Sequence, residues 1–503
     1  MSYWGLSGLS HDAALAVVNN TGEIVFASHS ERYTGNKHDA QFGNGLIDAA
    51  LSYGHPDATI WYETDWLKRL RQARAGQWNL VFEDPTPRQD LRNNFPDVFY
   101  DWADRSAPEW AQYKHHLTHA AAGFATSPYA DAAVLVIDAI GEFNSASIWR
   151  ADSDSSGNCT YNLLEKINYP HSLGLVYSAF TQRVGLRPLD EEYILMGMAA
   201  YGNPIYADDI RRDIICVDGN GFKCHSNWHR GIGNYLPMAS NEDLAASIQA
   251  VTEEIVLHMA RRAITVAKSE NLVYMGGVAL NCVANSQLGQ VAKNIWIMPN
   301  PGDAGSSIGA VAAHLGTKLK WEGPYLGHHI GGSAEYPGEQ IVKSLLKDPI
   351  AAVAWGRAEF GPRALGNRSL IADPRGKEIK DKVNEIKRRQ KFRPFAPMIL
   401  EEDVNDYFEM PVNIPTSPYM QFVAKCKHPN DFPAIVHADG TSRVQTVNAE
   451  QHPGLYQALK LWKDKTGCPI ILNTSLNIRG KPMVNNMQDA IDFRDMYKVN
   501  LIV

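Results

Sequence analysis

The chain has 503 residues, of which 45% are hydrophobic and 20% are charged, and its formal net charge is −7. A chain of this length exceeds what one hydrophobic core usually supports, so we expect at least two domains. The ordinary globular composition excludes a disordered or fibrous protein, and the negative net charge gives no general reason to expect a nucleic-acid partner.

The hydropathy of the chain predicts a cytoplasmic protein without a membrane partner. No apolar run reaches the roughly 18 residues that a transmembrane helix needs. Residues 1–4 lead directly into a strand-like segment, without the charged and apolar regions of a signal peptide. The six cysteines are too few for a disulfide scaffold, so we expect most of them to be reduced thiols.

The beginning of the chain alternates strand-like and turn-like segments. We expect strands at residues 3–6, 13–18 and 23–28. A similar succession recurs at residues 132–150, where a buried strand pattern, a loop that begins with Asp138 and a second strand follow one another. The repetition indicates an internal duplication and a two-lobed, actin-like or sugar-kinase-like α/β fold, although strand–turn–strand units also occur in many other mixed proteins.

Helices and strands alternate in the middle of the chain. Residues 241–268 are expected to form a long helix with Asn241 as its N-cap. A strand at 271–275 leads through two glycines into an expected helix at 278–288. A strand at 294–298 leads through a Pro-Gly-Asp turn into a further helix, so two strand–turn–helix units follow each other.

The last third of the chain differs in composition. Residues 323–332 are rich in Gly, Pro and His and form the expected linker. Strands are expected at 350–354, around 421–424 and at 470–473, and basic residues cluster at 363–375 and 387–393. We therefore expect a second α/β domain here.

A pair of histidines predicts a metal site. His115 and His119 are four residues apart, so on a helix they share one face and lie close enough to bind one ion. Asp138 at a strand end and Asp303 at a helix start add carboxylates. Such a set suits iron, zinc or manganese. For an isolated His pair of this spacing, a surface or a hydrogen-bonded core position is the more common alternative.

Two further patterns predict anion binding. Each Gly turn, one at Gly276-Gly277 and one around Asp303, leaves backbone N–H groups at a helix start, where a phosphate can bind. In the last third of the chain, Arg363 and Arg393 stand in stiff Pro-containing turns, and Arg forks match phosphate and carboxylate oxygens. For Arg388 and Arg389 we expect only a solvated charged surface.

Together these motifs resemble the O-carbamoyltransferases of the NodU/CmcH family, which modify antibiotics and nodulation factors. The resemblance extends nearly from end to end, over residues 8–14, 30–32, 37–39, 115–119, 196–202, 276–281, 302–305, 359–366, 392–397, 443–447 and 473–477. The number and order of these segments make chance agreement implausible.

The resemblance implies a fold and a reaction. An actin-like domain at residues 1–325, related to the tRNA threonylcarbamoyladenosine transferases, would be followed by a YrdC-like domain at residues 333–503. Carbamoyl phosphate and ATP, the latter with Mg²⁺, would react in the YrdC-like domain to give carbamoyl adenylate. This intermediate would move to the actin-like domain, where an acceptor hydroxyl takes the carbamoyl group and AMP leaves.

The resemblance also implies roles for residues. His11, beside the acceptor hydroxyl, and Asp12 are the candidate catalytic residues, and iron(II) or another divalent metal would be bound by His115, His119, Asp138 and Asp303. The nucleotide would contact Gly276, Gly277 and Asn281 in the actin-like domain. Carbamoyl phosphate and ATP would contact Arg363, Lys387, Arg393, Arg443, Asn473 and Ser475.

Two positions depart from the family pattern. Ala139 stands where a Gly is frequent, and Ile194 stands where a Lys is frequent, which removes a cation from a polar region. A nucleotide-binding regulator on a decayed enzyme scaffold is the alternative function. All candidate catalytic and ligand positions are filled, however, which favours the enzyme.

The acceptor is expected to be a small natural product or a hydroxymethylated pyrimidine such as 5-hydroxymethylcytosine in DNA. Residues 61–78 interleave Trp with Lys and Arg, as single-stranded or flipped-out bases require. The candidate acceptor-side residues are Lys37, Arg69, Arg71 and Arg74. The alternative is an amphipathic helix whose Trp and Leu residues pack inward and whose cations are solvated.

Overall fold

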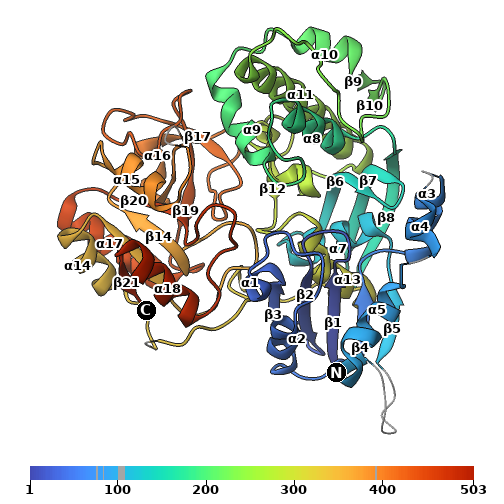
Figure 1. Ribbon diagram of the computed structural model, residues 1–503, viewed down its shortest axis with the longest axis horizontal. Helices are drawn as coiled ribbons and strands as arrows, with labels where there is room; N and C mark the ends of the chain where they lie inside the picture. Colours follow the sequence, from blue (N-terminus) through green and yellow to red (C-terminus); the bar gives the residue numbers. More distant parts are fainter. Residues whose placement is uncertain (75–76, 83, 100–107, 333, 391–392) are drawn as a thin grey trace. The chain divides into compact units, whose positions relative to one another are not determined.

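The computed structural model describes residues 1–503 except 75–76, 83, 100–107, 333 and 391–392. The described residues pack into two compact units (Figure 1). The N-terminal unit consists of Met1–Ser30, His38–Leu280 and Val291–Trp321, and the C-terminal unit consists of Glu31–Lys37, Asn281–Gln290 and Glu322–Val503. Both units combine helices with sheets, so the expected mixed α/β class is confirmed.

The N-terminal unit contains two sheets with the same topology (Figure 1). The first has the order β3-β2-β1-β4-β5, with β1 at Ser2–Ser7, β2 at Ala14–Asn19, β3 at Ile24–His29, β4 at Ala58–Trp61 and β5 at Glu109–Gln112. The second has the order β8-β7-β6-β11-β12, with β6 at Asp131–Gly141, β7 at Asn144–Ser153, β8 at Cys159–Asn168, β11 at Asn271–Met275 and β12 at Asn294–Trp296.

Strand directions repeat as well as strand order. In each sheet, the first three strands along the chain pair antiparallel, and two later strands add in parallel beside the first. The repeat confirms the internal duplication expected from the strand–turn–strand patterns.

Two helices lie between these sheets. α13 (Ser306–Leu315) packs on β1, α7 (His115–Thr126) packs on β6 and β11, and the two helices pack on each other (Figure 1). At Gly309 a Cβ would lie 1.8 Å from the carbonyl oxygen of Thr118, so glycine is required for this close approach. The packing sets the first turn of α7, the start of α13 and the end of β6 close together, which is where the site forms.

α11 (Asn241–Ala267) and α8 (Leu173–Arg183) also pack on β6. The expectation that Asn241 caps α11 is wrong, because the hydroxyl of Ser240 accepts from the backbone N–H of Asp243 at 3.1 Å. The expected helix at 278–288 is also wrong. Asn281 begins a new cap there, which divides the segment into η2 (Gly277–Leu280), α12 (Cys282–Asn285) and η3 (Leu288–Gln290).

The remaining elements of the N-terminal unit are short. They are α2 (Asn44–Leu51), α3 (Asp65–Arg74), α4 (Trp78–Phe82), α5 (Pro87–Asn94), α6 (Pro96–Phe99), α9 (Glu192–Met198), η1 (Ala199–Tyr201), α10 (Ala207–Asp213), β9 (Ile215–Asp218), β10 (Gly221–Cys224) and η4 (Asp303–Gly305).

The C-terminal unit is built on a mixed sheet of order β19-β15-β20-β14-β13-β21. Its strands are β13 (Ile350–Ala354), β14 (Arg368–Ala372), β15 (Ala396–Leu400), β19 (Gln445–Val447), β20 (Ile470–Ser475) and β21 (Asn500–Ile502). One face packs against α14 (Gly338–Lys347) and α17 (Pro453–Thr466), and the other against α15 (Ile379–Ile386) and α18 (Met487–Tyr497). The expected strands at 350–354 and 470–473 are confirmed.

The strand expected around 421–424 begins two residues later. It is β17 (Val423–Cys426), which forms a small sheet with β16 (Phe408–Glu409) and β18 (Thr441–Arg443). The other elements of this unit are α1 (Glu31–Thr34), η5 (Glu401–Asp403) and α16 (Val404–Tyr407).

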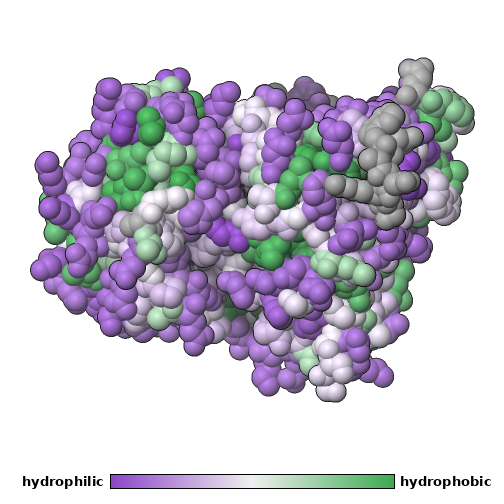
Figure 2. Space-filling view, turned by 90° about the horizontal axis from the view of Figure 1, so that it is seen from below, coloured by the Kyte–Doolittle hydropathy of each residue, from purple (hydrophilic) through white to green (hydrophobic). Residues whose placement is uncertain are grey.

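The surface and the cysteines agree with the composition. The face drawn in Figure 2 is largely hydrophilic, with hydrophobic residues in separate patches. No helix in the described part of the chain is long and apolar enough to cross a bilayer. The six cysteines, all within described segments, are free thiols as expected.

Candidate active site

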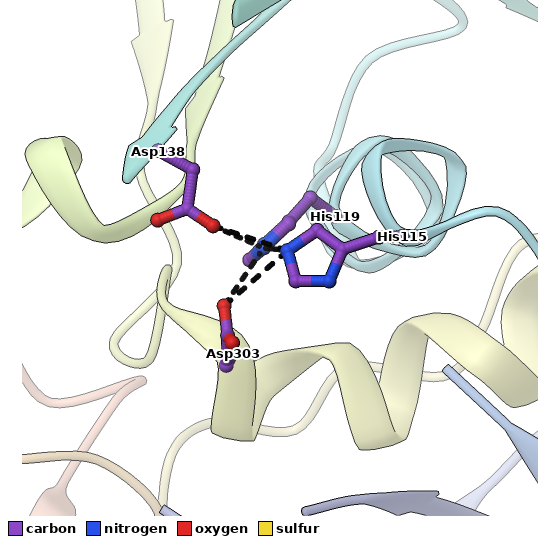
Figure 3. Close-up of side chains that lie close together, drawn as sticks. All are labelled: His115, His119, Asp138 and Asp303. Carbon is purple, nitrogen blue, oxygen red and sulfur yellow. Dashed lines mark hydrogen bonds and ion pairs between the residues drawn. The ribbon is translucent and has the colours of Figure 1, made fainter. Parts of the chain in front are cut away.

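Four side chains from three separate segments converge in the N-terminal unit (Figure 3). His115 and His119 project from α7, Asp138 lies toward the end of β6, and Asp303 begins η4. Their ligand atoms all lie within 4.8 Å of one another, and the side chains are buried. The structure therefore brings together the full set that the sequence predicted.

The spacing of these atoms fits a metal ion. Nε2 of His115 lies 3.0 Å from both Nε2 of His119 and Oδ2 of Asp138. Oδ1 of Asp303 lies 3.2 Å from Nε2 of His119 and 3.4 Å from Nε2 of His115. Ligand atoms about 2.1 Å from a tetrahedrally bound ion lie about 3.4 Å apart. Two imidazoles and two carboxylates also form a donor set that first-row divalent metals prefer.

The electrostatics of the cluster are those of a cation site. Burial would lower the pKa of His115, but the charge of Asp303 and the hydrogen bond with Asp138 raise it well above its ordinary value. Burial opposes ionisation of Asp138, but its bonds with the two imidazoles keep its pKa well below the usual range. The carboxylates thus stabilise positive charge at the centre.

His116, between the two histidine ligands in sequence, has a different role. Its Nδ1 lies 2.7 Å from the hydroxyl of Ser147. Burial and the neighbouring charges of His115 and His119 lower the pKa of His116 to about 3. It is a neutral, hydrogen-bonded core residue.

Two glycines shape the cluster. Gly141 leaves room for the ring of His115, because a Cβ there would lie 2.1 Å from Cδ2 of that ring. Gly277 donates its backbone N–H to Oδ1 of Asp138 at 3.1 Å, and Gly276, at φ +92°, donates to the carbonyl of Pro301 at 2.8 Å. The Gly276-Gly277 turn thus orients one carboxylate and ties down the loop before Asp303. Its nucleotide contact stays a prediction, and Asn281 belongs to the C-terminal unit.

His11 stands beside this cluster. Its Nδ1 lies 3.1 Å from Oδ2 of Asp12, and its Nε2 lies 3.4 Å from Oδ2 of Asp303. Burial would lower the pKa of His11, but the bond with Asp12 and the charges of Asp303 and Asp138 raise it to about 9. A cation on the cluster would neutralise two of these carboxylates. The predicted pair His11 and Asp12 therefore lies beside the cluster of possible metal ligands.

Sequence reasoning missed three residues near these histidines. His38 bonds the second oxygen of Asp12, and Asp190 bonds the other side of His38. Buried Glu63 lies 3.7 Å from Nδ1 of His115 and accepts from Lys68 at 2.7 Å. His38 stands within a motif shared with the family, whereas nothing in the local sequence distinguishes Glu63 or Asp190.

The predicted basic residues come from several segments of the C-terminal unit: Lys387 is the C-cap of α15, Arg443 ends β18, and Arg363 and Arg393 lie in loops. Nζ of Lys387 donates to the carbonyl of Ser475 at 2.5 Å and to Oδ1 of Asn477 at 2.7 Å. Burial, with the charges of Arg389 and Arg393, lowers the pKa of Lys387 well below its ordinary value. Several cations near one another favour an anionic ligand. Arg389 is half-buried over the ring of Phe395, so the expectation of a solvated surface is wrong for it.

The loop that carries Arg363 is held rigidly against this sheet. Oε1 of Glu359 accepts from the backbone N–H groups of Leu365, Asn367 and Arg368. Nδ2 of Asn473 donates to the carbonyl of Ala364 at 3.0 Å. Within the described residues, Oδ1 of Asn473 and Nε of Arg443 are buried without a hydrogen-bond partner. Phe392, in the shared motif, lies outside the described residues.

The candidate acceptor-side residues differ in their contacts, their exposure and the unit to which they belong. Arg69 bonds Asp65 at 3.0 Å and the carbonyl groups of Val81 and Asp84, so it joins α3 to α4. Arg74 is exposed, and Lys37 belongs to the C-terminal unit. No residue of α3, all of which is described, is buried. Trp66 is 64% exposed, which contradicts the inward packing of Trp and Leu considered above.

Ala139 and Ile194, which depart from the family pattern, lie in the following surroundings. The carbonyl of Ala139 accepts from the hydroxyl of Ser172 at 2.6 Å. Ile194 is buried in α9. At this position the chain therefore has a buried aliphatic side chain in place of the lysine that is frequent in the family.

Comparison with known proteins gives a consistent result. A family model described as "Carbamoyltransferase N-terminus" matches residues 99–312, and one described as "Carbamoyltransferase C-terminus" matches residues 342–503. "Uncharacterized protein sll1178" of Synechocystis sp. is 35% identical, over 97% of this chain and 93% of its own length. "Nodulation protein NolNO" of Sinorhizobium fredii is 31% identical, over 96% of this chain and 76% of its own length.

The match to a relative whose name states a reaction covers less of both chains. The 3'-hydroxymethylcephem-O-carbamoyltransferase of Amycolatopsis lactamdurans is 31% identical, over 64% of this chain and 65% of its own length. Among solved structures, HypF of T. kodakarensis aligns with 63% of this chain and 49% of its own at a TM-score of 0.35 and 13% identity, too distant to support an argument. The two family models and the nearly full-length relatives show that the chain belongs to the NodU/CmcH family of carbamoyltransferases.

Proposed function

We propose that this carbamoyltransferase makes carbamoyl adenylate from carbamoyl phosphate and ATP and then transfers the carbamoyl group to an acceptor hydroxyl. The observation that carries the proposal is the buried cluster of His115, His119, Asp138 and Asp303, with His11 3.4 Å from Asp303. This arrangement supports the proposal because four possible metal ligands and a candidate base lie side by side, and both kinds of group promote transfer of a carbamoyl group to a hydroxyl.

The first reaction is assigned to residues 333–503, as a YrdC-like domain. Water first cleaves carbamoyl phosphate into carbamate and phosphate. An oxygen of carbamate then attacks the α-phosphorus of Mg²⁺-bound ATP, and pyrophosphate leaves. The concentration of cations around Lys387, Arg389 and Arg393 supports this assignment, because every reactant is an anion. Arg443, with its buried unpartnered Nε, and Arg363 on its braced loop would contact phosphate oxygens.

The second reaction is assigned to residues 1–325, as an actin-like domain. The acceptor oxygen attacks the carbamoyl carbon, AMP leaves, and the acceptor proton passes to Nε2 of His11. Asp12 orients the ring through Nδ1. A divalent ion, iron(II) in the family, would be held by His115, His119, Asp138 and Asp303 and would supply Lewis-acid polarisation of the carbamoyl oxygen.

For the acceptor we propose a hydroxylated small molecule rather than DNA. The 3'-hydroxymethylcephem named for two relatives carries a primary hydroxyl of this class. A hydroxymethylated pyrimidine carries the same group. However, Arg69, one of the cations expected to follow a phosphate backbone, bonds within the α3–α4 segment, and the net charge of −7 opposes a polyanion.

The test is an acceptor panel. The purified protein, loaded with Fe²⁺, is incubated with carbamoyl phosphate, Mg²⁺-ATP and each acceptor, including 3'-hydroxymethylcephem and hydroxymethylated DNA, and products are read by mass spectrometry. The proposal predicts addition of one carbamoyl group that depends on both carbamoyl phosphate and ATP. Transfer that proceeds without ATP would contradict the adenylate route.

A further inference from the structure

A chain of alternating acids and bases extends from His11 into the N-terminal unit. Oδ2 of Asp12 lies 3.1 Å from His11, and its Oδ1 lies 2.7 Å from Nδ1 of His38. Nε2 of His38 lies 2.9 Å from Oδ1 of Asp190, whose Oδ2 lies 2.6 Å from Nη2 of Arg187. Side chains from three separate segments thus connect the candidate base to the surface, where Arg187 is 66% exposed.

The contacts of His38 fix its protonation state. A neutral imidazole has one N–H donor and one acceptor nitrogen, whereas the imidazolium has two donors. Both nitrogens of His38 face carboxylate oxygens at hydrogen-bond distance. Asp190 also contacts the guanidinium of Arg187, which favours its ionised form. Both nitrogens of His38 must therefore carry hydrogen, so His38 is a cation between two anions.

The backbone holds Asp12 and His38 against each other. Asp12 has φ +49° and His38 has φ +57°, a region that non-glycine residues rarely adopt. The backbone N–H groups of Leu9 and Ala13, on either side of Asp12, donate to the carbonyls of Ala40 and Asp39 at 2.8 and 2.7 Å. Such conformations persist only where the surroundings enforce them, and they concentrate at functional sites.

The contact between Asp12 and His38 restricts the orientation of His11. Because Oδ1 of Asp12 is occupied by His38, Oδ2 is the oxygen left for Nδ1 of His11. Nδ1 of His11 therefore faces Asp12, and its Nε2 faces Asp303 and the neighbouring side chains of His115, His119 and Asp138. Without His38, Asp12 could turn about its own side chain and take His11 with it.

We propose that His38, held as an imidazolium between Asp12 and Asp190, is a positioning residue that fixes the orientation of His11. The inference deepens the transfer reaction proposed above and rests on the role of His11 in it. Asp190 and Arg187 act in turn on His38, and none of the three needs to touch the acceptor.

The first test concerns His38 alone and needs no activity. In protein labelled with ¹⁵N-histidine, one set of the imidazolium ring-nitrogen signals seen near neutral pH should be missing in His38→Gln and present in His55→Gln, a substitution of an exposed histidine in the same unit. Neutral ring-nitrogen shifts for His38 would overturn the proposal.

The second test separates positioning from folding. His38→Gln should lower kcat for carbamoyl transfer by about 10-fold to 100-fold, the usual cost of losing a supporting residue, with KM for the acceptor and pyrophosphate release unchanged. Asp190→Asn should lower kcat in the same direction, and the double variant should be no worse than His38→Gln, because both act through one chain. Equal loss of both half-reactions, or additive losses, would overturn the proposal.

Failure of the proposed function can be distinguished from failure of the role inferred for His38. A wild-type protein that forms no carbamoyl adenylate and transfers no carbamoyl group refutes the proposed function, whereas the ring-nitrogen shifts of His38 still decide whether it is the fixed cation inferred here.

Discussion

At the scale of single residues, some contacts of the candidate active site could be predicted from the sequence and others could not. The spacing of His115 and His119 fixed their common helix face, and Asp138 and Asp303 were identified from a strand end and a helix start. His38 and Asp190 were not, because they are 152 residues apart and meet only through tertiary packing. Local patterns carry no information on such a contact.

The metal cluster gives the first residue-scale prediction. Replacement of His119 by Ala removes one of the four proposed ligands, so the metal content of protein purified with Fe²⁺ should fall well below that of the wild type, as measured by elemental analysis. His116→Gln is the matched control, because His116 bonds Ser147 instead. Full occupancy in the double variant His115→Ala/His119→Ala would remove this site from the account.

Arg443 gives the second prediction. Its Nε is buried without a hydrogen-bond partner in the described structure, whereas Arg368 uses its guanidinium on backbone carbonyls and supports the fold. Arg443→Ala should therefore reduce carbamoyl phosphate-dependent pyrophosphate release on the order of 100-fold, as loss of a charge-stabilising donor does. The exposed Arg388→Ala is the control. Unchanged release in Arg443→Ala would place the anion elsewhere.

At the scale of elements, strands were predicted better than helix ends. Buried apolar runs located β13 and β20, but hydrogen-bond competition at the caps decided the helices. Ser240 rather than Asn241 caps α11, because the serine hydroxyl reaches the N–H of Asp243. Asn281 interrupts an apolar segment that has helical periodicity. Caps depend on backbone conformation, which composition does not determine.

The start of α17 gives a prediction on pH. His452 accepts from the N–H of Leu455 through Nδ1 and lies 3.0 Å from Oδ1 of Asn367 through Nε2, as a neutral ring. Burial lowers the pKa of His452 to about 4. A lowered histidine pKa means that the unfolded chain binds the proton first, so stability is complete above about pH 6.5 and is lost as the pH falls toward 4, by about 3 kcal/mol.

Urea unfolding across this pH range checks the prediction. The wild type should lose stability between pH 6.5 and 4 more steeply than His452→Asn, which keeps a cap acceptor but has no ring to protonate. His428→Asn, at an exposed position, should follow the wild type. Parallel curves for wild type and His452→Asn would contradict the assignment.

The α3–α4 segment gives a prediction on the acceptor. If the acceptor is a small molecule, wild type and Arg71→Gln/Arg74→Gln should bind hydroxymethylated DNA equally weakly at every salt concentration, as measured by fluorescence anisotropy. A DNA-binding protein instead loses affinity steeply with salt, and removal of phosphate contacts flattens that dependence. Arg69 is left intact because it joins α3 to α4. A steep slope that flattens in the variant would favour DNA.

At the scale of the whole molecule, two sheets of identical topology and a separate α/β unit divide the chain. The duplication was predictable because both copies begin with the same strand–loop–strand pattern. That two short segments, Glu31–Lys37 and Asn281–Gln290, belong to the C-terminal unit was not predictable, because it depends on packing between segments far apart in sequence. The proposed division of chemistry follows the two units.

The most direct test of this division compares both half-reactions in His11→Ala. Pyrophosphate release with carbamoyl phosphate and ATP is measured beside carbamoyl transfer to an acceptor identified by mass gain. Because His11 belongs to the N-terminal unit and lies beside Asp303 of the proposed metal site, we predict that release stays at the wild-type rate while transfer is lost. Equal loss of both half-reactions would contradict the account.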